Sequence, residues 1–286
     1  MKLRIGGCSG GGEKSYIKLS EYGFQCADFG MANTEGFWYT CTHSEFEKRL
    51  LQEKSWAHEH GIEIHQLHGP WDHNEWDLHI EFTPEKLRRL SEVRKKAISA
   101  CSYLGCKNMV IHPIFPYGDS DTKTGKAEET IRLNIELYSG LVETAKEYGV
   151  TICYENMPHA SFSLNSVDSI KRVIDEINDD HFKACLDTGH VVCLNTQSLG
   201  DAVRTLGKDL KVLHVHDSKP RFDYHMIPYY GDGDWDSFYE GLKDIGYNGV
   251  FSLETLPSRK LSPHIYDEMA KNLVKIAKQI IHYDED

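Results

Sequence analysis

The stretch Val212–His225 reads VLHVHDSKPRFDYH, and it is the most informative segment of this chain. It begins as an apolar run with β-branched residues, which is typical of a buried strand. His214 and His216 interrupt that run, and side chains two residues apart on a strand point to the same face. More ionisable side chains follow the predicted strand end: Asp217, Lys219, Asp223 and His225. So many ligand-type groups at one strand end favour a bound metal ion over a packed core.

Short β-rich runs alternate with longer helical patterns along the whole chain, which is typical of repeated βα units. Eight such runs are predicted as strands: Leu3–Gly6, Phe24–Phe29, Ile62–His68, Asn108–His112, Val150–Glu155, Phe182–Asp187, Lys211–His216 and Gly249–Glu254. No linker rich in proline, glycine and serine separates them. We therefore expect an α/β fold in which residues 1–286 form one domain, a (β/α)8 TIM barrel.

The alternation of side chains along these strands supports a barrel, because alternate residues point inward and the others meet the helices. On the seventh predicted strand, Leu213 and Val215 would face the helices, while Val212, His214 and His216 would point inward. The sixth strand sends Asp187 inward by the same rule, and the eighth sends Glu254 inward. The polar side chains thus gather at the carboxyl ends of the strands, where barrel enzymes place their chemistry.

Composition limits the classes of partner. The formal charge of −12 would repel a phosphate backbone, so we expect no nucleic-acid partner. No run approaches the roughly 18 to 20 apolar residues of a membrane span, and no signal peptide is apparent, so no membrane partner is expected. The eight cysteines form no C-x-x-C pair and favour buried thiols in the cytoplasm. Homo-oligomerisation is left open.

Candidate ligands lie at the predicted strand ends and in the loops that follow: His68, His112, Glu155, Asp187, His190, His214, His216, Asp223, His225 and Glu254. Strands five to eight would bring Glu155, Asp187, His214 and Glu254 around one arc of the barrel mouth. Carboxylates together with a neutral imidazole suit one divalent metal ion. Mn²⁺ is the expected ion, and Zn²⁺, Co²⁺ or Mg²⁺ are alternatives.

Five segments give this chain a resemblance to xylose isomerase-like TIM barrels, the superfamily of sugar-phosphate isomerases, ketose 3-epimerases and endonuclease IV. In chain order they are Tyr154–Asn156, Leu186–His190, His214–Asp217, Asp223–His225 and Gly231–Gly233. The resemblance implies a metal held by Glu155, Asp187, Glu254 and one histidine of the seventh strand. In several relatives the ligand histidine stands three residues before an acid, which indicates His214; the strand pattern alone favours neither His214 nor His216.

The resemblance implies an isomerase that transfers a proton through an enediolate on a ketose or a related polyol derivative. Glu155 and Glu254 would be its catalytic acid and base. Removal of the proton from one face and its return from the other would invert the carbon, whereas one base on one face would give aldose–ketose isomerisation. The expected sugar-binding residues are His68, Trp71, His112, His190, His216, Lys219 and His225.

Two other functions remain open. An endonuclease IV-like phosphodiesterase with a trinuclear zinc site is one, because its ligand types are present here: His68, His112, Glu155, Asp187, His190, His214, Asp223, His225 and Glu254. The negative charge argues against it, because a DNA enzyme needs a cationic docking face. The other is a non-catalytic barrel that binds a sugar. Metal content would separate these functions, with one ion for the sugar enzyme and three zinc ions for the phosphodiesterase.

Overall fold

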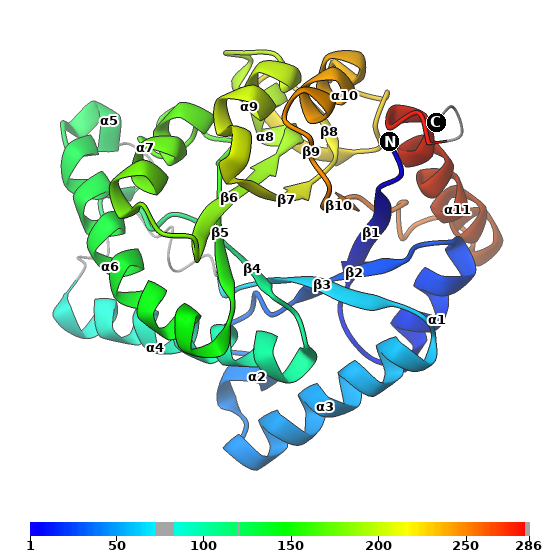
Figure 1. Ribbon diagram of the computed structural model, residues 1–286, viewed down its shortest axis with the longest axis horizontal. Helices are drawn as coiled ribbons and strands as arrows, with labels where there is room; N and C mark the ends of the chain where they lie inside the picture. The colour runs from blue at the N-terminus through cyan, green and yellow to red at the C-terminus, as the bar shows by residue number, and fades with distance from the viewer. Residues whose placement is uncertain (72–82, 119–120, 284–286) are drawn as a thin grey trace.

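The computed structural model describes residues 1–71, 83–118 and 121–283. Parallel strands form a ring at the centre and helices surround it (Figure 1). The strands of this ring are β1 (Arg4–Ser9), β2 (Cys26–Gly30), β3 (Glu63–His68), β4 (Asn108–Ile111), β5 (Thr151–Glu155), β6 (Phe182–Asp187), β7 (Leu210–His214) and β10 (Val250–Leu253). The predicted (β/α)8 barrel is confirmed.

The strand order in the sheet is β10-β1-β2-β3-β4-β5-β6-β7, and every pairing is parallel. The ring closes between β7 and β10, where Val215, the residue after β7, pairs with Leu253 of β10. There, the backbone N–H of Val215 donates to the Ser252 carbonyl at 2.8 Å, and the N–H of Glu254 donates to the Val215 carbonyl at 2.9 Å. This closure sets the ends of β7 and β10 side by side and therefore brings their polar residues together.

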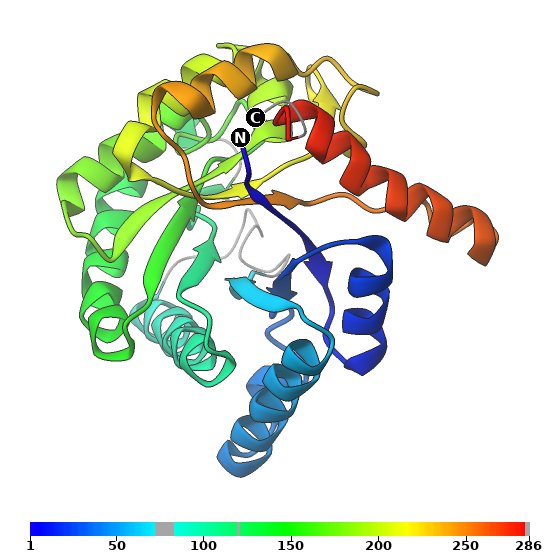
Figure 2. The same cartoon turned by 45° about the vertical axis from the view of Figure 1, so that its right-hand side comes forward.

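Helices cover the outside of the ring (Figure 2). They are α1 (Glu13–Tyr22), α2 (Phe37–Thr40), α3 (His43–Glu59), α4 (Pro84–Leu104), α5 (Asp121–Thr124), α6 (Ala127–Tyr148), α7 (Val167–Ile177), α8 (Thr188–Leu194), α9 (Leu199–Leu206), the 3-10 turn η3 (Gly207–Asp209), α10 (Trp235–Asp244) and α11 (Pro263–Ile280). The amino group of Met1 donates to the carbonyl of Ile281, the residue that follows α11, at 3.0 Å.

The core has two layers, as the strand pattern predicts. Leu213, Val215 and their counterparts on other strands belong to the large cluster between sheet and helices. A separate small cluster fills the inside of the ring and consists of Val110, Cys153, Cys185 and Val212. One residue from each of four successive strands thus closes the barrel interior beneath the polar strand ends.

Two strand predictions need correction. The first strand is predicted to end at Gly6, but β1 continues through Gly7 to Ser9. These glycines serve close packing, because a Cβ on Gly6 would lie 2.9 Å from Val250 Cγ1 and one on Gly7 would lie 2.8 Å from the Phe24 ring.

The second correction concerns the segment after β7, which looks like a loop in the sequence. It forms an antiparallel ribbon of β8 (Asp217–Lys219) and β9 (Phe222–Met226) beside the barrel mouth. Arg221 at its turn adopts a positive φ of 74°, a conformation that is typical of glycine or asparagine and is not predicted for arginine.

Among the described residues, no helix combines the length and apolarity that crossing a bilayer requires. All eight cysteines are free thiols.

Candidate functional site

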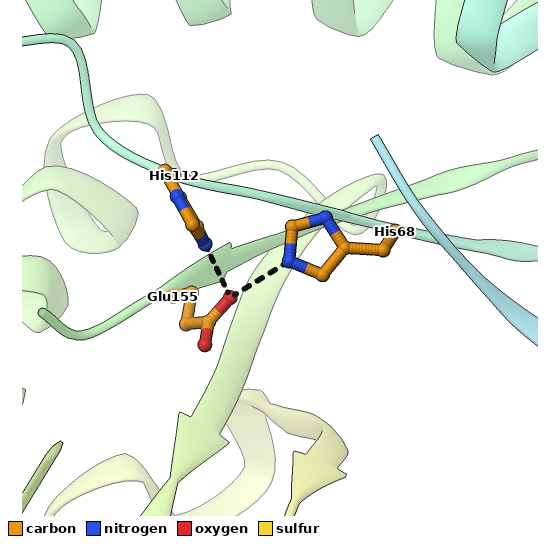
Figure 3. Close-up of side chains that lie close together, drawn as sticks. All are labelled: His68, His112 and Glu155. Carbon is orange, nitrogen blue, oxygen red and sulfur yellow. Dashed lines mark ion pairs between the residues drawn. The ribbon is translucent and has the colours of Figure 1, made fainter. Parts of the chain in front are cut away.

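The first part of the site joins the carboxyl ends of three neighbouring strands (Figure 3). His68 ends β3, His112 follows β4 and Glu155 ends β5. Glu155 Oε2 lies 3.2 Å from His112 Nε2 and 4.0 Å from His68 Nε2. The two imidazole rings meet edge to face with 5.0 Å between centroids. Both imidazoles therefore aim a nitrogen at one carboxylate oxygen.

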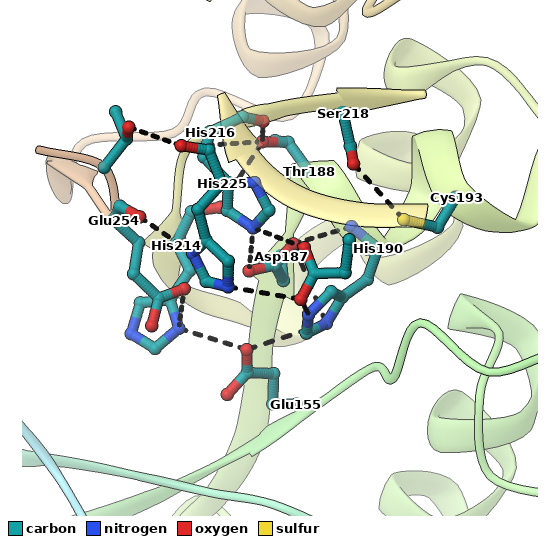
Figure 4. A network of polar contacts seen from close by, with 12 residues as sticks. Glu155, Asp187, Thr188, His190, Cys193, His214, His216, Ser218, His225 and Glu254 are labelled. Carbon is teal, nitrogen blue, oxygen red and sulfur yellow. Dashed lines mark hydrogen bonds and ion pairs between the residues drawn. The ribbon is translucent and has the colours of Figure 1, made fainter. Parts of the chain in front are cut away.

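The second part lies on the other side of Glu155 and comes from β7 and β10 (Figure 4). His214 Nδ1 is 3.1 Å from Glu155 Oε1 and 3.2 Å from Glu254 Oε2. His214 is completely buried, Glu155 is 1% exposed, and the side chain of Glu254 is 18% exposed. Three of the four predicted metal ligands thus converge on one point, even though β5 and β10 are far apart in the sequence.

Asp187, the fourth predicted ligand, has different neighbours. Its Oδ2 lies 3.0 Å from His216 Nε2, and its Oδ1 accepts from the backbone N–H of His190 at 2.7 Å as the cap of α8. His190 connects it to the first group, because Nδ1 of this ring lies 3.7 Å from Asp187 Oδ1 and 3.9 Å from Glu155 Oε1. The two histidines of the predicted seventh strand therefore contact different carboxylates. His214 faces Glu155 and Glu254, whereas His216 faces Asp187.

The ribbon of β8 and β9 supplies the third part of the site. Along β9 the contacts alternate: Asp223 and His225 contact histidines of the barrel, whereas Phe222 and Tyr224 stack on each other at the surface. Asp223 Oδ2 lies 3.2 Å from His225 Nε2 and 3.5 Å from His190 Nε2. The His225 ring also stacks on His216 at 4.1 Å (Figure 4). The ribbon therefore extends the cluster over the barrel mouth.

These groups surround a pocket of about 290 Å³ at the barrel mouth. The residues that line it are His68, Trp71, His112, Glu155, Met157, Pro158, His159, His190, Asp223, His225 and Glu254. His68, Trp71, His112, His190 and His225 thus lie where the sequence analysis expects a sugar, and the Trp71 ring lies 5.5 Å from that of His112. His216 is completely buried and does not line the pocket. Lys219 is exposed at the end of β8 and does not line the pocket.

Hydrogen bonds from the neighbouring residues hold these strand ends together. The Asn156 side chain bonds both the N–H and the carbonyl of Asp187, at 2.9 and 3.0 Å, and the Asn156 carbonyl lies 2.6 Å from His190 Nδ1. Thr188 Oγ1 donates to the His216 carbonyl at 2.7 Å. The ends of β5, β6 and β7 are therefore clamped in a fixed register.

The ribbon and the following loop are organised by one buried carboxylate, Asp217. It accepts hydrogen bonds from four backbone N–H groups, those of Ser218, Tyr229, Gly231 and Gly233, and from the indole of Trp235. Gly231 has no room for a side chain, because a Cβ there would lie 2.1 Å from the Ser218 carbonyl oxygen. The Gly231–Gly233 segment therefore serves as a cradle for Asp217, and it is not a phosphate loop.

Comparison with known proteins agrees with this architecture. A family model described as xylose isomerase-like TIM barrel matches residues 17–276. The chain belongs to this family. The present chain is 26% identical over 199 residues to an inosose isomerase of Bacillus licheniformis. It is 23% identical over 244 residues to a D-psicose 3-epimerase of Enterocloster bolteae. These matches cover 67% and 84% of the present chain.

The chain spans about two thirds of the length of several curated relatives: 63% of an uncharacterized protein of Methanocaldococcus jannaschii and 67% of the inosose isomerase, against 76% of the epimerase. Among solved structures, a D-psicose 3-epimerase crystallised in the presence of D-fructose superimposes with a TM-score of 0.78. This comparison covers 98% of the present chain and 99% of the other at 17% identity. At that identity it supports the fold alone.

Electrostatics in this xylose isomerase-like barrel separate the two glutamates. Burial raises the pKa of Glu155, but the imidazoles of His214 and His112 outweigh it, and the pKa lies well below its usual value. Burial raises the pKa of Glu254 to about 7, helped by the charges of Glu155 and Asp187. One carboxylate is therefore ionised at neutral pH while the other is near its midpoint, the arrangement that acid–base pairs use.

The histidines respond to the same charges. Burial lowers the pKa of His190, but Asp187 and Asp223 raise it to about 9. Burial also lowers the pKa of His214, whereas Cys185 and the nearby glutamates raise it, and the net pKa lies well above its usual value. By contrast, burial and the neighbouring His112 lower the pKa of His68. In the metal-free protein, protons on His190 and His214 therefore balance the buried carboxylates.

The side chains present fit a divalent cation. Glu155 Oε2 is buried, and two imidazole nitrogens lie near it, His112 Nε2 at 3.2 Å and His68 Nε2 at 4.0 Å. Donor atoms of His68, His214 and Glu254 lie within 4.8 Å of one another, as do those of His68, His112 and Glu155. Imidazole nitrogen mixed with carboxylate oxygen is the donor set that Mn²⁺, Co²⁺ and Zn²⁺ accept.

Two ionisable residues at the site were not predicted from the sequence. His159 lines the pocket from the segment after β5, and nothing in its local pattern marks it. Asp28 lies on β2 with its Oδ2 2.8 Å from His214 Nε2. A signal for Asp28 exists, because an acid within the apolar run Cys26–Phe29 needs a buried partner.

Gly189 is expected to be intolerant of any side chain. A Cβ at this position would lie 1.9 Å from His216 Cε1, and His216 is itself held by Asp187 and Thr188. Gly189→Ala should therefore lower the free energy of unfolding by about 1–3 kcal/mol through overpacking. Urea denaturation measures this change.

The matched control is Gly140→Ala in the middle of α6, where a Cβ meets no atom within 4 Å. That substitution should raise the free energy of unfolding by about 0.5–1 kcal/mol, because alanine favours a helix. Equal behaviour of the two variants would show that His216 is not held at this contact.

Proposed function

We propose that this protein is a divalent-metal-dependent sugar isomerase, of the ketose 3-epimerase or aldose–ketose type. The observation that carries the proposal is the approach of Glu155 and Glu254 to the same atom, His214 Nδ1, at 3.1 and 3.2 Å beside the pocket. Two carboxylates that reach one point from β5 and β10 are placed to act on one substrate carbon from two sides. The inosose isomerase and D-psicose 3-epimerase relatives support this reaction class.

The cation would be held by Glu155, His214 and Glu254, with Asp187 as the fourth ligand expected from the resemblance. When bound, it would polarise the substrate carbonyl and increase the acidity of the adjacent C–H bond. Mn²⁺ is the ion we propose, with Zn²⁺, Co²⁺ or Mg²⁺ as alternatives.

The glutamates would carry the proton. One removes it from the carbon next to the carbonyl, which yields an enediolate, and the other returns a proton to the opposite face and inverts the carbon. In the metal-free protein the two carboxylates already differ, because the pKa of Glu155 is lowered while that of Glu254 is raised to about 7. His190 and His225 line the same pocket and would bind sugar hydroxyls.

The pocket suits a small, unphosphorylated sugar. Its volume of about 290 Å³ lies at the lower end of the ~300–1,000 Å³ range of small-molecule sites. The described residues that line the pocket include no lysine or arginine, so none of them offers a lysine or arginine charge to bind a phosphate group. Trp71 offers an aromatic face to the carbon face of the sugar.

The direct test is a screen of ketoses with Mn²⁺ in deuterated water, followed by NMR. Deuterium at carbon 3 with inversion of that centre is expected for an epimerase, whereas deuterium at carbon 1 or 2 of an aldose–ketose pair indicates an isomerase. Binding of ketoses without any proton exchange would contradict the proposal and favour a non-catalytic sugar-binding barrel.

One observation favours an endonuclease IV-like zinc phosphodiesterase as the second candidate. Two further ligand groups flank the central one, His68 with His112 and Glu155, and His216 with Asp223 and His225. The net charge of −12 opposes a nucleic-acid substrate. Elemental analysis of the purified protein separates the candidates: one ion per chain supports the sugar enzyme, while three zinc ions with phosphodiesterase activity would replace it.

A further inference from the structure

The side chain of Asp28 is buried inside the barrel, away from the pocket. In the register of the sheet it stands opposite Cys8 on β1 and Gln66 on β3, and only 5% of the residue is exposed. It does not line the pocket. A buried carboxylate is unfavourable unless it is paired, so this position needs an explanation from its contacts.

Among the described residues, the side chain of Asp28 contacts His214 and Gln66. Its Oδ2 lies 2.8 Å from His214 Nε2, and Gln66 Nε2 donates to the same oxygen at 3.0 Å. Gln66 Nε2 also lies 3.4 Å from the carbonyl oxygen of Leu213, the residue before His214. Gln66 thus fixes Asp28 relative to the strand that carries His214.

The two nitrogens of His214 therefore have different environments. Nε2 faces Asp28, while Nδ1 faces Glu155 and Glu254 at 3.1 and 3.2 Å. The plane of the ring is held by His68, which stacks on it with 5.5 Å between centroids and 12° between planes. A neutral imidazole whose Nε2 donates to a carboxylate has its Nδ1 lone pair free for a cation, and such a partner also orients the ring.

We infer that Asp28 is a positioning residue that keeps the proton of neutral His214 on Nε2 and thereby presents Nδ1 as the ligand atom. The inference rests on the proposed function, since it concerns the same cation site. It extends that site to Asp28 on β2 and to Gln66 on β3, the strand that also carries His68. Asp28 itself touches neither the pocket nor the substrate.

The test replaces Asp28 by asparagine, which preserves shape and removes the charge. Asparagine can also donate its amide to Nε2, which would move the proton to Nδ1 and block the ligand atom. Calorimetric titration with Mn²⁺ should show binding weakened about 10- to 100-fold, the usual effect of losing such a partner. The visible spectrum of the Co²⁺-loaded protein should change as well, because the ring is less well oriented.

The matched control is Asp209→Asn, which removes another buried carboxylate, one paired with Lys183 and Lys171 just before β7. This variant is expected to lose stability and to retain the wild-type affinity for Mn²⁺. A purely structural role of Asp28 would give the two variants the same profile, and that result would overturn the inference.

A measurement on the unmodified protein covers the case in which Asp28→Asn does not fold. Two-bond ¹H–¹⁵N NMR of the Zn²⁺-loaded protein should show His214 protonated at Nε2 and coordinated through Nδ1. Coordination through Nε2 would overturn the inference while leaving the proposed function intact. If the unmodified protein binds neither Mn²⁺ nor Zn²⁺, the proposed function itself fails.

Discussion

Glu254→Gln is expected to lower kcat for proton exchange on the ketose by roughly 100- to 10,000-fold, the range that a positioned acid or base contributes. Glutamine keeps the shape of the side chain but cannot take up a proton. The variant should remain folded, because Glu254 is partly exposed and stands at the pocket wall. Steady-state kinetics on the ketose identified by the deuterium screen, at saturating Mn²⁺, measures the loss.

The control for Glu254 is Glu240→Gln on α10, an exposed carboxylate whose partner is Lys243. It should leave kcat unchanged. A Glu254→Gln enzyme with near-normal turnover would exclude the assigned role of this residue.

The raised pKa of Glu254 predicts how the affinity for Mn²⁺ changes with pH. Because it is raised to about 7 in the metal-free protein, Glu254 holds a proton below pH 7 that a cation must displace. The affinity of the wild-type protein for Mn²⁺ should therefore rise as the pH increases from 6 to 8. In Glu254→Gln that dependence should be shallower, which calorimetric titrations at several pH values would detect.

Glu155→Gln is expected to remove both metal binding and stability. Glu155 Oε1 faces His214 and Oε2 faces His112, so this one side chain contacts both sides of the cluster. Loss of a direct ligand should weaken Mn²⁺ binding by more than the ~100-fold limit for outer partners. Loss of the charge also leaves a buried imidazolium unbalanced, which should cost about 3–5 kcal/mol of unfolding free energy.

Calorimetry and urea denaturation of the metal-free protein measure the two effects separately. Glu143→Gln on α6, where the side chain is 76% exposed, serves as the control and should change neither quantity. A ten-fold change in affinity corresponds to about 1.4 kcal/mol. If the variant binds Mn²⁺ with an affinity within about three-fold of the wild type, Glu155 is not a ligand.

The barrel could be predicted because its strands carry their own signals. Phe182–Asp187 is found with the predicted bounds, and the others differ at one end or both by up to three residues. The inward positions of Val110, Cys153, Cys185 and Val212 follow directly from the two-residue period of a strand. The β8–β9 ribbon was missed because its turn contains Arg221 at positive φ in place of a glycine or asparagine.

Periodicity and strand-end residues are local properties of the chain, so they were enough to predict a parallel barrel with Glu155, Asp187, His214 and Glu254 at the ends of their strands. Which of these groups meet depends on how the barrel closes. Barrel closure brings Glu254 to His214, and Asp187 turns to His216 instead. The partnership of Asp28 with His214 joins residues 186 positions apart, and a contact of that range depends on how the whole ring closes.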